Sequence, residues 1–112
     1  MKRIFHPGGS VVTGSDLADA VLHYAEALSN RQQVDVVDIP ILGDAGLPGR
    51  AQFLIGAASQ LVSVTAEAVT RELVETETTD LLRRKALGPV SQVSSAWSAD
   101  ELAAMQLDDF DY

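Results

Sequence analysis

The chain has 112 residues, of which 46% are hydrophobic, a formal net charge of −8 and no cysteine. This length and composition predict one domain with a packed core and exclude a largely disordered chain. The excess of acidic residues disfavours non-specific binding to nucleic acid or anionic membranes, and the lack of cysteine excludes disulfides, thiol catalysis and thiolate metal sites.

The N-terminal segment lacks the pattern of a signal peptide. Lys2 and Arg3 are basic, but Pro7-Gly8-Gly9 follows before an apolar stretch can develop. No apolar run in the sequence approaches the length that a bilayer crossing requires. We therefore expect a soluble, cytoplasmic protein.

A β-hairpin and an amphipathic helix are predicted for the first thirty residues. Residues 2–6 and 10–13 flank Pro7-Gly8-Gly9, where glycine supplies the positive φ of a tight turn. We expect the helix to run from Ser15 to Asn30, with Thr13 as its N-terminal cap and Asn30 in a left-handed exit conformation. Its apolar residues recur at the three- and four-residue spacing of one buried stripe: Leu17, Ala20, Val21, Tyr24, Ala25 and Leu28.

Three further strands are predicted after the helix. The runs are rich in β-branched residues and bounded by turn formers, and they cover residues 34–41, 51–55 and 61–65. Pro40 belongs at a strand end or on an edge strand because it has no backbone donor. Residues 43–49 are expected to form a loop, and the last two strands to pair as a hairpin around residues 56–59. Alternation places residues on common faces of these strands, one of which must meet the helix: Ala51, Phe53 and Ile55 on one strand, Val62 and Val64 on the other.

A second helical segment is predicted for residues 67–87. Arg83-Arg84-Lys85 occupy its last turn, where cations suit the helix dipole, and Gly88-Pro89 ends it. A phosphate or nucleic-acid patch is the less favoured interpretation of this basic triplet. Residues 91–95 are polar and typical of a linker. Ser98-Ala99-Asp100-Glu101 is a capping box that predicts a further short helix, and this acidic end of the chain is either a solvated tail or a docking segment for a basic partner.

No grouping of residues predicts catalysis, a metal site or a cofactor. His6 precedes a glycine turn, and His23 is expected at the edge of the apolar stripe. Asp35 and Asp38 are three residues apart on one strand, so they should face opposite sides and cannot act together as a carboxylate pair. A free-standing enzyme is therefore the least favoured interpretation.

The predicted fold class is α+β. We expect a mostly antiparallel sheet of four or five strands in the order β-β-α-β-β-β, with one helix on its face and a second helix beside it. Residues 1–88 form the compact domain, and residues 89–112 form a linker and a short acidic appendage, helical or disordered. A right-handed parallel crossover of residues 11–13, the first helix and residues 34–41 is an alternative arrangement.

The favoured function is a non-enzymatic interaction or assembly module, most simply a homodimer. Its expected partner-binding residues are the apolar ones of the second helical segment and the appendage: Leu73, Leu81, Leu82, Trp97, Leu102 and Met105. The alternative is a small-ligand-binding domain, or an accessory subunit of an enzyme whose catalytic residues lie on another chain. In that case the backbone at Gly8, Gly9, Gly46 and Gly49 would hold the ligand, although these loops lack the order of a phosphate or dinucleotide loop.

Overall fold

The computed structural model describes residues 1–67 and 71–96 of the chain. Within these ranges the elements follow the predicted order, with one five-stranded sheet, two α-helices and a short 3₁₀ turn. Every paired strand is antiparallel, and the strand order across the sheet is β4-β3-β2-β1-β5. The α+β class is confirmed.

The first hairpin forms as predicted. Strands β1 (Lys2–His6) and β2 (Gly9–Thr13) pair along their full length around a turn at Pro7 and Gly8. Gly9 has a φ of 143°, a conformation that a residue with a Cβ adopts only with strain.

Helix α1 (Ser15–Asn30) carries the core of the molecule. Every residue of its predicted apolar stripe is buried, and the stripe packs on Ile4, Ile39 and Ile55 from three different strands. The two ends of the helix differ from the prediction. The Thr13 hydroxyl donates to the Pro40 carbonyl at 2.7 Å instead of capping the helix, and the left-handed residue after the helix is Gln32, with a φ of 56°, instead of Asn30.

Strand β3 (Val34–Leu42) returns toward β2 in the antiparallel sense, which rules out the parallel crossover. A helix of 16 residues carries the chain away from β2 by about 24 Å, at 1.5 Å per residue. A strand of nine residues brings it back by about 30 Å, at 3.3 Å per residue. As a result β3 meets β2 only at the pair Val12 and Leu42, near the end of both strands.

A turn that includes the 3₁₀ helix η1 (Asp44–Gly46) leads from β3 into strand β4 (Pro48–Gly56). These strands pair at nine positions, from Val34 with Gly56 to Leu42 with Pro48. The alternation predicted for β4 is confirmed, because Phe53 and Ile55 pack on the core while Leu54 between them is exposed. Side chains of β1 and β4 also meet, because the rings of His6 and Phe53 stack with their centroids 5.3 Å apart.

Strand β5 (Val62–Thr65) corrects the predicted second hairpin. It pairs with β1 at the opposite edge of the sheet, whereas β4 pairs with β3. The intervening residues turn the chain away, because Gly56 has a φ of 128° and the Ala57 N–H donates to the Gln33 carbonyl at 2.9 Å. The chain then crosses to β1, where Leu61 packs against the core.

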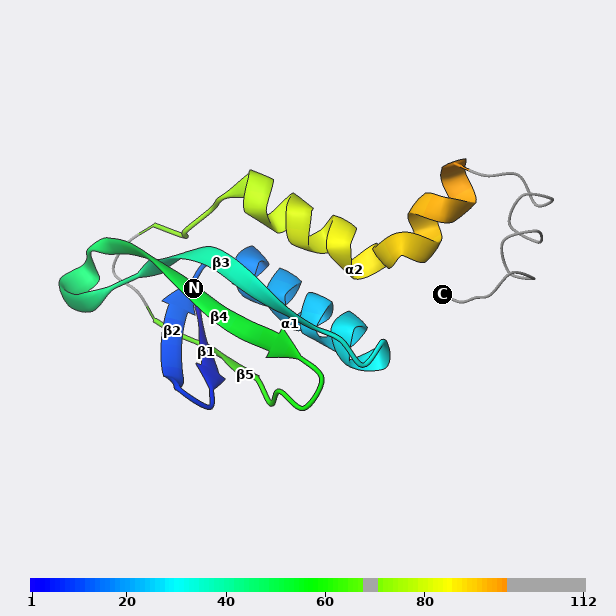
Figure 1. The fold of residues 1–112 in the computed structure, drawn as a ribbon. Helices are drawn as coiled ribbons and strands as arrows, with labels where there is room; N and C mark the ends of the chain where they lie inside the picture. Colours follow the sequence, from blue (N-terminus) through cyan, green and yellow to red (C-terminus); the bar gives the residue numbers. More distant parts are fainter. Residues whose placement is uncertain (68–70, 97–112) are drawn as a thin grey trace.

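Helix α2 (Thr76–Ala96) lies beside α1 (Figure 1) and begins later than predicted. Residues 71–75 have no regular structure, because this segment packs across the start of α1 and its Leu73 carbonyl lies over Gly14. Gly88, with a φ of 77°, breaks the helix into two pieces instead of ending it. The backbone of residues 91–95 is helical and not the predicted linker, and residues 97–112 lie outside the described part of the chain.

Candidate functional site

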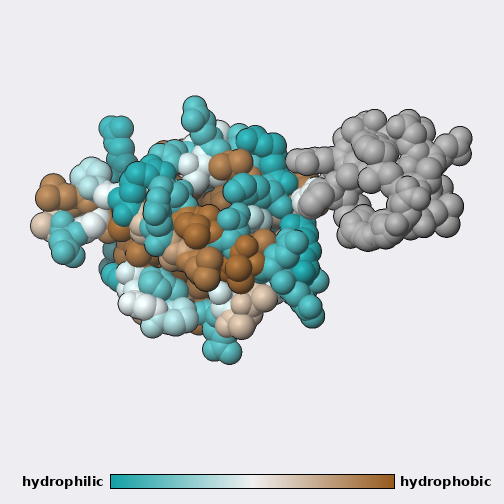
Figure 2. All heavy atoms as spheres, in the orientation of Figure 1, coloured by the Kyte–Doolittle hydropathy of each residue, from teal (hydrophilic) through white to brown (hydrophobic). Residues whose placement is uncertain are grey.

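An exposed apolar surface lies on the outer side of the β3–β4 hairpin. Val34, Val36 and Leu54 are 55%, 52% and 59% exposed, and Val36 and Leu54 are direct cross-strand partners. We call these three residues the β3–β4 patch. Hydrophobic surface gathers near the middle of the face drawn in Figure 2, the side from which β4 is seen in front of α1 in Figure 1.

A charged network borders the β3–β4 patch further along the same hairpin. The Arg50 guanidinium bonds Asp38 at 2.7 Å and Glu75, which precedes α2, at 3.0 Å. The Gln52 amide donates to Asp38 at 2.9 Å, and Thr78 donates to Glu75. These contacts lower the pKa of Asp38, chiefly through Gln52 and then Arg50, and lower the pKa of Glu75, chiefly through Arg50.

The two acidic residues of the strands face opposite sides of the sheet, as predicted. Asp35 turns to the helical side, where it accepts bonds from the Tyr24 hydroxyl and, at 3.3 Å, from the Lys85 ammonium. Burial and the Asp35 contact raise the pKa of Tyr24 to about 12. Asp38 is the only acidic strand residue on the outer side, and Arg50 neutralises it. Because Arg50 also pairs with Glu75, these three charged groups together leave one net negative charge at this border.

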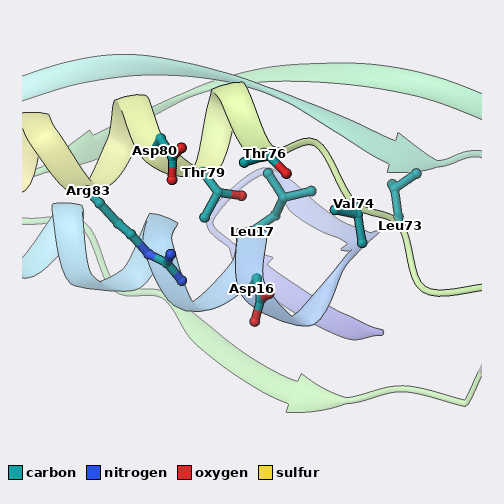
Figure 3. A pocket seen from close by; sticks show the side chains of 8 residues that line it. All are labelled: Asp16, Leu17, Leu73, Val74, Thr76, Thr79, Asp80 and Arg83. Atoms are coloured by element: carbon teal, nitrogen blue, oxygen red, sulfur yellow. The ribbon is translucent and has the colours of Figure 1, made fainter.

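The start of α1 borders a small cavity of about 70 Å³ (Figure 3). Buried Leu17 and Thr79 lie at its wall, and the Arg83 side chain extends from α2 toward α1. Ligand sites for organic molecules usually occupy about 300–1,000 Å³. This cavity has room for solvent but not for an organic ligand.

The same region shows how the start of α1 is capped. Glu72, from the segment before α2, accepts hydrogen bonds from the Ser15 N–H and, at 2.7 Å, from the Met1 amino group. These contacts lower the pKa of Glu72 to about 2, with the amino group as the larger cause. A carboxylate at this end also complements the helix dipole.

The glycines predicted to bind a ligand do not come together in one lined site. A depression of about 310 Å³ lies between β2 and the loop after β3, and among its lining residues are Arg3, Ser10, Gly43 and Asp44. The four predicted residues are placed elsewhere: Gly8 in the exposed first turn, Gly9 at the start of β2, Gly46 in η1 and Gly49 within β4. Of the predicted loop, Gly43 lines this depression and Gly46 and Gly49 do not, and ligand binding by these glycines stays a prediction.

The histidines are engaged locally. His6 accepts a hydrogen bond from the Gly8 N–H at 3.1 Å and stacks on Phe53, while exposed His23 lies 3.9 Å from Glu26. Within residues 1–67 and 71–96, no group of three or more His, Asp or Glu side chains is placed to hold a metal ion. Neither helix in these ranges is long and apolar enough to cross a bilayer.

The predicted partner-binding residues on α2 and on the segment before it differ in burial. Leu82 is 4% exposed and packs on α1, so its assignment to a partner surface is corrected. Leu73 is half-buried beside the start of α1, whereas Leu81 remains exposed on α2. Trp97, Leu102 and Met105 lie outside the described residues.

The β3–β4 patch was not among the predicted sites, although the sequence contains a signal for it. Residues 34–42 are apolar at both odd and even positions apart from Asp35 and Asp38. A strand that is apolar on both faces needs two covering layers, and α1 supplies only one. No protein-family model, curated protein or solved structure shows a significant match to this chain.

Proposed function

We propose that the protein is a non-enzymatic assembly module that forms a homodimer through the β3–β4 patch. The observation that carries the proposal is the exposure of three large apolar side chains on adjacent strands. Clustered apolar surface of this kind is typical of a contact with another protein.

The distribution of charge favours a second copy of this chain as the partner that covers the β3–β4 patch. Two molecules that each carry −8 repel one another over most of their surfaces. The β3–β4 patch itself is uncharged, and the Asp38, Arg50 and Glu75 network at its border carries one net negative charge, so repulsion between two copies is weaker there than over the rest of the surface. In a two-fold arrangement the same residues face each other, with Leu54 of one copy on Val36 of the other.

The test is the mass of the protein in solution with two matched variants. Leu54→Glu adds a charge inside the patch, whereas Leu47→Glu adds the same charge at a residue that is 65% exposed outside it. Light scattering at micromolar concentration should give about twice 11.9 kDa for the unmodified chain and for Leu47→Glu. Leu54→Glu should give a monomer, because a buried unpaired charge is costly.

Two results would reject the proposal. One is a monomer at every accessible concentration of the unmodified chain. The other is a dimer that both variants weaken equally, which would place the contact elsewhere, for example at exposed Leu81 on α2.

The ligand-binding alternative is supported by a different observation. A third cavity lies in the helical layer, where basic side chains gather around an apolar wall. It involves none of the residues of the β3–β4 patch, so the two properties can be tested separately.

A further inference from the structure

A cavity of about 220 Å³ opens where the end of α1, the start of β3 and the break in α2 meet. Tyr24 and Leu28 form its apolar wall, and both belong to the buried core. The other lining residues are polar, cationic or glycine: Arg31, Gln33, Arg84, Lys85 and Gly88. Its volume lies just below the usual range of about 300–1,000 Å³ for ligand sites, so it suits only a small ligand, but the combination of an apolar wall and a few polar groups is typical of such sites.

Arg31 is held in place by the backbone of α2. Its guanidinium donates to the Lys85 carbonyl at 3.3 Å and to the Ala86 carbonyl at 2.6 Å. A Cβ at position 88 would lie 2.2 Å from Nη2 of Arg31, so any other residue would make the guanidinium shift, and the φ of 77° at this position also favours glycine. Arginine has five N–H donors, and donors not used by these two carbonyls remain for a ligand.

The charge of this region runs against that of the whole chain. Four of the eight basic residues are Arg31 and the run Arg83-Arg84-Lys85, and three of these line the cavity. One carboxylate, Asp35, pairs with Lys85 at 3.3 Å, which leaves an excess of two positive charges. The carbonyls of Lys85 and Ala86, just before the break in α2, accept hydrogen bonds from Arg31. Arg84 is therefore not needed to satisfy these carbonyls, and capping of the helix alone does not explain its positive charge at this position.

From this geometry we propose that the cavity binds a small phosphate monoester with an apolar or aromatic group. The planar fork of a guanidinium matches two phosphate oxygens, and Arg84 and Arg31 provide two such groups at one site. The wall of Tyr24 and Leu28 packs against the organic part. The site lies in the helical layer and is independent of the proposed dimer contact, so either property can fail without the other.

Phenyl phosphate, inorganic phosphate and phenol are the probes for this site. Each is titrated into the ¹⁵N-labelled full chain while amide resonances are followed. Phenyl phosphate should give saturable shifts at Leu28, Arg31, Lys85 and Gly88, inorganic phosphate weaker shifts at the same amides, and phenol none. A lack of saturable shifts up to about 10 mM phenyl phosphate, or shifts confined to other regions, would overturn the proposal.

Two neighbouring variants separate a defined site from general attraction to positive charge. Arg84→Gln and Arg83→Gln remove the same charge from exposed positions of α2, but Arg83 lines the small cavity at the start of α1. Losing a charged hydrogen-bond donor should weaken phenyl phosphate binding about tenfold or more in Arg84→Gln. Arg83→Gln should bind within about twofold of the unmodified chain, because exposed charges are screened by salt. Equal weakening in both variants would mean diffuse electrostatic binding and would also overturn the proposal.

Discussion

Gly14 shows how one residue can depend on a distant segment. Its φ of −64° is open to any amino acid, yet a Cβ there would lie 1.7 Å from the Leu73 carbonyl oxygen. Gly14→Ala must therefore push the segment before α2 away from α1. We expect a loss of about 3 kcal/mol in the free energy of unfolding, the upper part of the range for overpacked sites, measured by urea denaturation.

Gly49→Ala is the control for this residue-scale prediction. A Cβ at position 49 would make only ordinary contact with the Ile41 side chain, at 3.7 Å. Alanine also reduces the entropy of the unfolded chain, so this variant should be unchanged or more stable by up to about 1 kcal/mol. Equal stability of the two variants would show that Leu73 does not pack over Gly14.

At the scale of elements, the start of α2 is fastened to the sheet by ionised groups. Glu75 and Asp38 both bond Arg50, and the pKa of each carboxyl is below its ordinary value. A lowered folded-state pKa means that the charged form stabilises the fold at neutral pH. This stabilisation is lost as the pH falls from about 4.5, the ordinary value for glutamate, through the lower folded-state value. We expect hydrogen exchange at the first turns of α2 to accelerate over this range, after correction for the intrinsic pH dependence of exchange.

Arg50→Met tests the cause of this acid sensitivity. At neutral pH the variant should already show faster exchange at the start of α2, and acidification should add less than in the unmodified chain. Arg3→Met removes the same charge from an exposed arginine that bonds Ser10 on β2, so it should leave α2 unchanged. An Arg50→Met variant with normal α2 exchange and the full acid response would contradict the assignment.

For the whole molecule, the net charge predicts how association responds to salt. Each chain carries −8, so bringing two copies together costs electrostatic energy that added ions reduce. The screening length falls from about 10 Å at 0.1 M to about 3 Å at 1 M ionic strength. We expect the proposed dimer to tighten as NaCl rises over this range in sedimentation experiments. Weaker association at high salt would indicate a contact held by ion pairs and would argue against the β3–β4 patch.

The sequence by itself determined the features that depend on near neighbours. The three- and four-residue spacing of apolar residues defined α1 from Ser15 to Asn30, and Pro7-Gly8-Gly9 placed the first turn. Alternation along residues 51–55 placed Ala51, Phe53 and Ile55 on one face of β4, and Phe53 and Ile55 pack on the core. Each of these depends on backbone geometry within a few residues, so a local pattern is sufficient to predict it.

Only the tertiary structure decided which distant segments meet. β5 pairs with β1 and not with β4, Glu72 replaces Thr13 at the start of α1, and Leu82 faces α1 instead of a partner. The same applies to the cavity, where Arg31 and Lys85 are brought together from positions 54 residues apart. Such contacts depend on how whole layers cover one another, and no spacing within a short window records that choice. The candidate sites of this protein therefore lie at the junctions between elements, where two helices meet and where the described residues leave apolar side chains of β3 and β4 exposed.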